Sequence, residues 1–161
     1  MTKLAVYLET SVIGHATSRP SRDLVVAGHQ QVTRDWFALR AQAYELFVSQ
    51  LVATEAAGGD AEAAQERTAF LRGILQLAIT DATGELAAKL VASGAVPRKA
   101  GEDALHIAVA AVHGVDYLLT WNCKHIANAT RRQAIERVCR EAGYEPPVIC
   151  TPEELMNDEP N

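Results

Sequence analysis

Acidic and amide side chains follow two of the predicted strands of this chain. Glu9 comes directly after the apolar run at 4–8, and Asn122 follows a second apolar run at 116–120. In a parallel sheet, ligands bind beyond the carboxyl ends of the strands, so the residue just after each strand is a candidate for a site. We therefore expect a carboxylate and an amide to meet at one edge of the sheet.

Two more carboxylates lie at helix positions that favour a site. Asp103 opens a helix that is apolar on almost every side, and Glu55 lies in the last turn of a short helix, where the helix dipole does not favour a negative charge. Simpler interpretations stay open. Glu9 and Glu55 could be exposed carboxylates, whereas Asp103 and Asn122 could be helix caps. Asp116 opens its strand, so we place it at the opposite edge and outside the site.

Strand and helix patterns alternate along the chain. Short apolar runs predict strands at 4–8, 44–48, 75–79, 116–120 and 147–150. Apolar spacing and cap signals predict helices over 22–40 (after Pro20-Ser21), 49–57, 60–74, 82–93, 103–112 and 130–141, and a last helical turn from Thr151. This alternation predicts one three-layer α/β domain over residues 1–161, with a mostly parallel sheet flanked by helices.

The charge balance excludes one class of nucleic-acid-binding protein. The chain of 161 residues has 15 Lys and Arg against 20 Asp and Glu, a formal net charge of -5. A polybasic coat protein needs an excess of positive charge to bind phosphates. A metal-dependent nuclease does not, because bound cations attract the phosphate to its cluster of carboxylates.

Cysteine and histidine spacing gives no sign of a zinc site. The three cysteines, Cys123, Cys139 and Cys150, include no C-x-x-C pair, and the five histidines include no H-x-x-x-H or H-E-x-x-H pair. His106 falls on the helix face of Asp103, where a packing role is the simpler interpretation. An odd number of cysteines, a first apolar run too short for a signal peptide and the lack of a long apolar segment predict a cytoplasmic protein without a membrane span.

Four short motifs occur in order along the chain. They are Y-L-E-T-S-V-I at 7–13, S-x-L-V-A-T-E at 49–55, E-D-A-L-H-I-A at 102–108 and L-L-T-W-N at 118–122. Together they resemble the PIN-domain family, and most closely the VapC ribonuclease toxins of bacterial toxin-antitoxin pairs. The resemblance covers about residues 4–125, which is essentially the whole domain.

The resemblance implies a PIN-like fold and an acidic pocket that holds Mg²⁺ or Mn²⁺ for the hydrolysis of RNA phosphodiesters. Its acids correspond here to Glu9, Glu55 and Asp103, and its fourth position corresponds to Asn122. Glu9 and Asp103 would bind the ion directly. Glu55 would bind it through water or orient the attacking water, and Asn122 would be a weaker ligand. We expect the three carboxylates to lie close enough to share one hydrated ion.

The chain matches the family at two accessory positions and departs from it at two others. Ser11 and Thr120 match the hydroxyl-bearing neighbours of the family's site. The first acid is usually Asp, whereas Glu9 is one methylene longer, and the fourth position is commonly Asp, whereas Asn122 has no charge. Three carboxylates and an amide can still hold a hard divalent ion, so one metal is better supported than two.

The resemblance also implies partners, and two rival functions stay open. An antitoxin protein and a second copy of the chain are the expected partners, beside the RNA substrate. One rival is a PIN-fold module that binds RNA or protein without cleaving. The other is a phosphohydrolase of the haloacid dehalogenase type, whose motif places a second Asp where this chain has Ser11.

Overall fold

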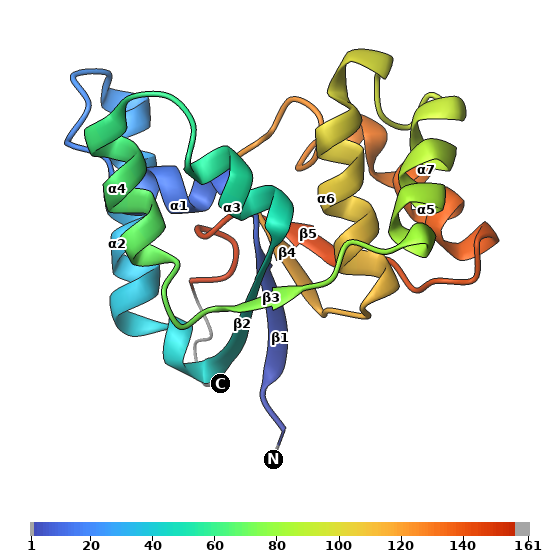
Figure 1. The fold of residues 1–161 in the computed structure, drawn as a ribbon, viewed down its shortest axis with the longest axis horizontal. Coiled ribbons are helices and arrows are strands. Elements are labelled where there is room, and N and C mark those ends of the chain that lie inside the picture. Colours follow the sequence, from blue (N-terminus) through green and yellow to red (C-terminus); the bar gives the residue numbers. More distant parts are fainter. Residues whose placement is uncertain (1, 157–161) are drawn as a thin grey trace.

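Five parallel strands form the centre of the molecule in the computed structural model, which describes residues 2–156 (Figure 1). They are β1 (Leu4–Leu8), β2 (Tyr44–Ser49), β3 (Leu75–Leu77), β4 (Tyr117–Leu119) and β5 (Val148–Cys150). Their order across the sheet is β3-β2-β1-β4-β5. Tyr7 of the central strand pairs with Phe47 of β2 and with Leu118 of β4. All five predicted strands are confirmed, and the sheet is parallel throughout.

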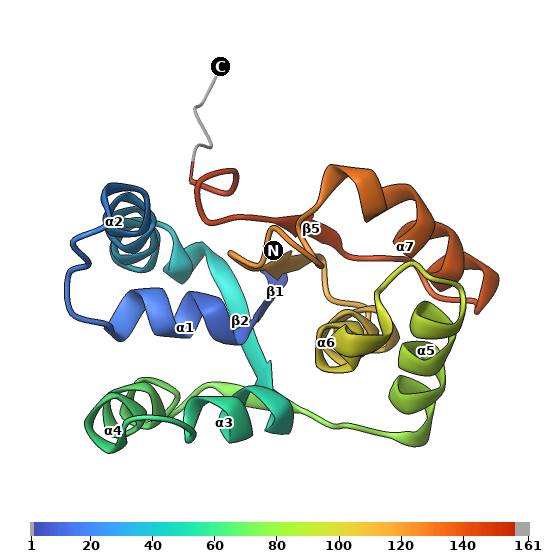
Figure 2. The ribbon, with the colours of Figure 1, turned by 90° about the horizontal axis from the view of Figure 1, so that it is seen from above.

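Seven α-helices of the described residues cover the sheet in two groups. They are α1 (Thr10–Thr17), α2 (Leu24–Leu39), α3 (Gln50–Ala56), α4 (Ala61–Phe70), α5 (Asp81–Ala92), α6 (Gly101–Val112) and α7 (Ala129–Glu141). Figures 1 and 2 show α1 to α4 on one side of the sheet and α5 to α7 on the other. This confirms the predicted three-layer α/β fold. Among residues 2–156, no helix is both long enough and apolar enough to cross a bilayer.

The strand order creates one position where the chain reverses its direction across the sheet. The chain adds β2 and β3 on one side of β1 and then returns to place β4 on the other side. The crossover segments that follow β1 and β4 therefore leave from opposite faces, and the carboxyl ends of two such strands are where ligands bind in parallel α/β sheets. Glu9 and Thr120 directly follow these strands.

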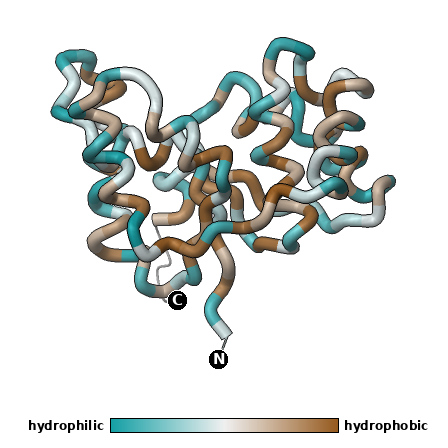
Figure 3. The backbone as a smooth tube through the Cα atoms, in the orientation of Figure 1, coloured by the Kyte–Doolittle hydropathy of each residue, from teal (hydrophilic) through white to brown (hydrophobic). Residues whose placement is uncertain are grey.

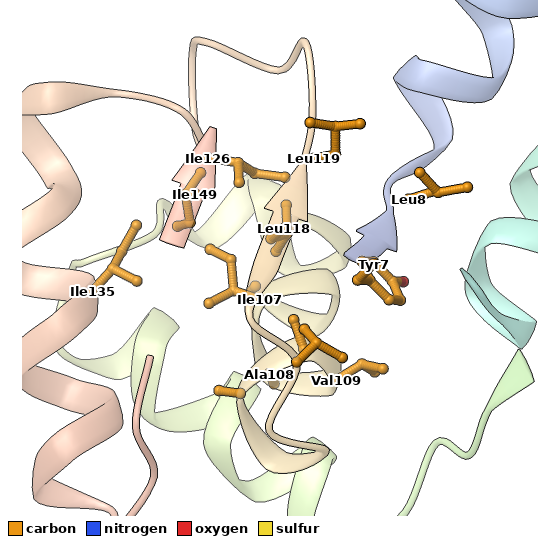
Figure 4. Packing of buried hydrophobic residues seen from close by; sticks show 14 of the residues in the cluster. Tyr7, Leu8, Ile107, Ala108, Val109, Leu118, Leu119, Ile126, Ile135 and Ile149 are labelled. Carbon is orange, nitrogen blue, oxygen red and sulfur yellow. The ribbon is translucent and has the colours of Figure 1, made fainter. Parts of the chain in front are cut away.

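The core lies between the sheet and α6. Seven residues of α6 are buried, as its apolar sequence predicted. Figure 4 shows side chains of this helix packed among those of β1, β4 and β5, and Figure 3 shows that hydrophobic residues run through the central strands. The site at the strand ends therefore stands on strands that are buried in the core.

Helix α1 is the main element that the sequence pattern missed. The Glu9 side chain accepts a hydrogen bond from the backbone N–H of Ser11 and so caps this helix. Its first turns contain Thr10, Val12 and Ile13, which are β-branched and therefore resemble a strand or loop in sequence. A smaller correction concerns α2, which is capped by Asp23 and not by the Pro20-Ser21 pair.

The predicted capping box after β5 is present. The Glu154 carboxylate accepts from the backbone N–H of Thr151 at 2.8 Å, and the Thr151 hydroxyl accepts from the N–H of Glu154 at 3.3 Å. One helical turn follows this box before the end of the described residues.

The three cysteines are free thiols in unequal surroundings. Cys139 and Cys150 are buried, whereas Cys123 is exposed on the loop after β4. Burial raises the pKa of Cys139 to about 11 and that of Cys150 to about 12. Partial burial, with a smaller effect from the charge of Glu154, raises the pKa of Cys123 as well. No disulfide joins them, as predicted from their spacing.

Candidate active site

The carboxylate of Glu9 lies buried where β1 and β4 end. Its residue is 6% exposed, and its backbone N–H donates to the carbonyl oxygen of Leu119 at 3.1 Å. The carboxylate accepts hydrogen bonds from the hydroxyls of Ser11 and Thr120, the latter at 2.5 Å. The alternative of an exposed carboxylate at Glu9 is therefore wrong. The structure also places both accessory residues in direct contact with the first predicted acid.

The same two hydroxyls hold the loop that follows β4. The Ser11 hydroxyl accepts the backbone N–H of Trp121 at 2.8 Å, and the Thr120 hydroxyl accepts the backbone N–H of Asn122 at 2.9 Å. Each hydroxyl thus donates to Glu9 and accepts from the loop. This arrangement fixes the position of Asn122 relative to Glu9.

Glu55 is brought to the site by Thr10 and His106. One of its oxygens, Oε1, accepts from the Thr10 hydroxyl at 2.6 Å and from Nε2 of His106 at 2.6 Å. The Glu55 side chain is 27% exposed, so the alternative of a simple exposed carboxylate is wrong here too. Because Thr10 is the neighbour of Glu9 in the chain, this bond holds Glu55 against the first turn of α1.

His106 continues this contact into the core. Its other ring nitrogen, Nδ1, lies 2.7 Å from the Tyr7 hydroxyl, which in turn lies 2.8 Å from the Ser49 hydroxyl. All three side chains are fully buried. A neutral His106 that donates to Glu55 and accepts from Tyr7 satisfies every group, with Ser49 donating to Tyr7. Burial raises the pKa of Tyr7, so its phenol stays neutral.

The surroundings keep Glu55 ionised at neutral pH. Burial by itself raises the pKa of this carboxyl group. The hydrogen bonds from His106 and Thr10 act against burial, and the net result is a pKa below its ordinary value. Glu55 is therefore a charged acceptor in a fixed orientation.

Asp103 lies in the first turn of α6 but does not cap it. The N-cap position is Ala100, which makes no side-chain cap bond. Oδ2 of Asp103 instead accepts from Nδ1 of His125 at 2.8 Å, on the loop after β4. The helix-cap alternative for Asp103 is therefore wrong, and its carboxylate points across to the loop that also carries Asn122.

Asn122 caps a turn and not a helix, so the helix-cap interpretation is wrong here as well, since the next helix, α7, is capped by Asn128. Its side-chain oxygen accepts the backbone N–H of His125 at 3.0 Å, and its carbonyl oxygen accepts from Ile126 at 3.2 Å. The cap thereby fixes the turn that presents His125 to Asp103. Hydrogen bonds thus join Glu9, Asn122 and Asp103 through Thr120 and His125. A separate set joins Glu55 to Thr10 and His106, and we call the two sets together the acidic network.

Asp116 lies outside this network. Its carboxylate accepts the backbone N–H of Ala5 at 2.8 Å, near the start of β1. This is the opposite edge of the sheet, as predicted.

The donor set fits a hydrated divalent ion better than a fully enclosed one. Within residues 2–156, no three side chains of His, Cys, Asp or Glu gather closely enough to hold a metal ion together, so the expectation that the three carboxylates share one ion is not confirmed. Mg²⁺ keeps several waters and is commonly bound by one or two carboxylates together with substrate phosphates. Carboxylate and amide oxygens are suitable hard ligands, and Oδ1 of Asp103 has no hydrogen-bond partner among the described residues. The metal-ligand role of Glu9, Glu55, Asp103 and Asn122 stays a prediction.

Sequence reasoning missed several residues of the network. Thr10 stands between two residues of the first motif, so its position in sequence was a usable signal. His106 contacts Glu55, which is 51 residues away, and not Asp103 on its own helix. His125 follows Asn122 by three residues, the spacing at which a cap presents a side chain. Tyr7 lies inside the first strand, and nothing in its local sequence distinguishes it from a packing residue.

Comparisons with known proteins support the fold. No model of a protein family matches the chain, and no curated protein matches it. A solved chain does match in structure, and it belongs to the crystal structure of VapBC2 from Rickettsia felis bound to a DNA fragment from their promoter. The two chains are 18% identical and superpose with a TM-score of 0.59, over 92% of this chain and 98% of the other. The chain therefore shares its α/β fold with a protein of a VapBC2 complex.

Proposed function

We propose that this chain is a Mg²⁺- or Mn²⁺-dependent ribonuclease and the toxin of a type II toxin-antitoxin pair. The observation that carries the proposal is the hydrogen-bonded set of Glu9, Asn122 and Asp103 at the carboxyl edge of the sheet, beside which Thr10 and His106 hold Glu55. Its place at the reversal of strand order is where ligands of parallel α/β sheets bind. The fold shared with a chain of a VapBC2 complex supports the toxin assignment.

Each acid has a different role in the proposed reaction. Glu9 and Asp103 would hold the ion, with Asn122 as a weaker ligand. A bound divalent ion would polarise the phosphate and stabilise the leaving oxygen. Glu55 accepts a hydrogen bond from the attacking water and orients it, because Thr10 and His106 hold its carboxylate in place.

The partners follow from the same proposal. The substrate is RNA, whose phosphates approach an acidic site only when a cation is bound there. The protein partners are an antitoxin and a second copy of this chain, in the cytoplasm. A dimer mass in light scattering at micromolar concentration is the expected result, and a monomer mass would argue against the second copy.

A second candidate function is a PIN-like module that binds RNA or protein without cleaving. Two observations favour it. The Glu9 carboxylate already accepts three hydrogen bonds within the protein, and the amide oxygen of Asn122 is used as a cap. Both groups then have less capacity to bind an ion.

Metal dependence separates the two candidates. The experiment is single-turnover cleavage of a structured RNA with Mn²⁺ or with EDTA, together with calorimetric titration of the protein with Mn²⁺. Binding of Mn²⁺ and cleavage that EDTA abolishes would support the ribonuclease. Binding of RNA without cleavage at any Mn²⁺ concentration would favour the module, and cleavage that survives EDTA would overturn the metal-dependent mechanism.

A further inference from the structure

Three aromatic rings gather beside the acidic network. His15 comes from α1, His29 from α2 and Trp121 from the loop after β4. The rings of His29 and Trp121 are stacked, with centroids 4.0 Å apart and planes inclined by 11°. His15 lies 5.9 Å from Trp121 and 6.1 Å from His29. We call these three residues the ring cluster.

The ring cluster is attached to the residues that hold Glu9. The backbone N–H of Trp121 donates to the Ser11 hydroxyl, and Nδ1 of His15 donates to the Ser11 carbonyl oxygen at 2.8 Å. Trp121 also stands between Thr120 and Asn122 in the chain. The cluster is therefore a direct neighbour of the candidate active site.

A buried hydroxyl keeps the stack in place. The indole Nε1 of Trp121 donates to the Thr33 hydroxyl at 2.7 Å, and this hydroxyl donates to the carbonyl oxygen of His29 at 2.6 Å. Thr33 is fully buried. One side chain thus fixes both members of the stack before any ligand arrives.

The cluster keeps polar atoms that the protein does not use. Nε2 of His15 and both ring nitrogens of His29 have no hydrogen-bond partner among residues 2–156, yet none of them belongs to the buried unpaired side-chain atoms of this part of the chain. They therefore reach solvent. These nitrogens are therefore accessible to a ligand.

We propose that the ring cluster is a stacking site for an unpaired base of single-stranded RNA, next to the phosphate held at the acids. This inference rests on the proposed ribonuclease function and names how its substrate is held. The acids repel RNA, whereas stacking on aromatic rings does not depend on net charge and accepts any base. The free ring nitrogens of His15 and His29 provide hydrogen-bonding groups to the same nucleotide.

The two tryptophans allow a direct test. Trp36 is fully buried, whereas Trp121 is partly exposed, so a change of fluorescence on binding reports Trp121. The titrant is a short oligoadenylate with Ca²⁺ in place of Mg²⁺, and its integrity is checked on a gel. The matched ligand is an abasic oligonucleotide of the same length and charge. We expect saturable quenching by oligoadenylate and binding at least about fivefold weaker for the abasic strand.

Variants locate the site. His29→Ala should weaken binding of oligoadenylate at least about fivefold, whereas His113→Ala should leave it unchanged. His113 is an exposed histidine at the other end of α6 and serves as the matched control. Trp121→Phe keeps a ring, so it should retain affinity in fluorescence anisotropy with labelled RNA while losing the quenching signal.

Each outcome bears on one proposal. Equal affinity for the two strands, or unchanged binding by His29→Ala, would overturn the stacking site even if the protein cleaves RNA. Quenching by oligoadenylate without cleavage of any RNA would overturn the ribonuclease and leave the stacking site standing. Quenching by an aromatic peptide but not by RNA would assign the cluster to a protein partner and overturn the inference.

Discussion

Two carboxylate–histidine pairs in this molecule have the same chemistry in different surroundings. Glu55 and His106 are 2.6 Å apart, and Asp103 and His125 are 2.8 Å apart. The His106 side chain is fully buried and its second nitrogen contacts Tyr7, whereas the His125 side chain is 15% exposed and its second nitrogen has no hydrogen bond within residues 2–156. The first pair is anchored in the core and the second lies on a one-turn loop.

This difference in surroundings suits Glu55 and Asp103 to different roles. A carboxylate whose partner is fixed by the core keeps one orientation, as a group that positions water must. A carboxylate whose partner lies on a loop can exchange that partner for an ion, because no second hydrogen bond of the His125 ring holds that partner in place. We therefore assign orientation to Glu55 and binding to Asp103, and four measurements test this assignment.

The largest expected effect is on cleavage. Asp103→Asn keeps the shape of the side chain but removes the charge of a direct ligand, so the single-turnover rate should fall at least ~100-fold, or about 2.7 kcal/mol at ~1.36 kcal/mol per tenfold. Asp116→Asn makes the same change at the opposite edge of the sheet and should cleave like the wild type. An Asp103→Asn protein of full activity would end the ribonuclease proposal.

The next effect distinguishes the two histidines by stability. His106→Ala removes a buried ring and leaves Glu55 and Tyr7 without a partner, so the free energy of unfolding should fall by about 3 kcal/mol. His125→Ala should lower it by less than about 1 kcal/mol, because its pair is partly exposed. Urea denaturation measures both. Equal losses of unfolding free energy would contradict the difference between the pair anchored in the core, Glu55 with His106, and the pair on the loop, Asp103 with His125.

A smaller loss is expected from the Tyr7 hydroxyl. Tyr7→Phe keeps the buried ring but removes the link between His106 and Ser49, which should cost about 1 to 2 kcal/mol of unfolding free energy. Tyr144→Phe, near the end of α7, is the control and should change little, since no hydrogen bond of its hydroxyl is recorded among the described residues. A Tyr7→Phe protein as stable as the wild type would show that the buried chain of bonds does not support Glu55.

The smallest effect is the pH dependence of the Glu55 pair. The pKa of the Glu55 carboxyl group in the folded protein lies below the unfolded value of about 4.3. The stability that the ionised carboxylate contributes is therefore fully present above that value and disappears as pH falls through the folded pKa. Glu55→Gln should therefore be less stable than wild type at neutral pH, with a difference that shrinks in acid. Urea midpoints at several pH values give this difference. A stability difference between wild type and Glu55→Gln that grows as the pH falls would contradict this prediction.

The sequence predicted where the site lies in the fold better than it predicted which side chains contact one another within it. Apolar spacing predicted every strand, and the rule that ligands bind after parallel strands predicted where Glu9 and Asn122 meet. Local signals also predicted the Ser49 cap of α3. These features depend on neighbours in the chain or on topology, which a single sequence expresses directly.

The pairings themselves could not be predicted. His106 reaches Glu55 only because α3 and α6 approach the strand ends from opposite sides of the sheet, and Trp121 meets Thr33 across 88 residues of sequence. Such contacts depend on distances between packed elements. The cap formed by Glu9 was missed for a different reason, since Glu is not a preferred cap residue and the β-branched residues after it do not favour a helix.

Because the three cysteines are unequally buried, only Cys123 is accessible to a labelling reagent. Cys139 and Cys150 are shielded in the core, whereas Cys123 stands on the turn between Asn122 and His125. A maleimide dye should therefore label the native protein at one position, in mildly alkaline buffer because the pKa of this thiol is raised. The dye would sit on the loop that carries the partner of Asp103, so its emission would follow the exchange of that partner for a metal ion in real time.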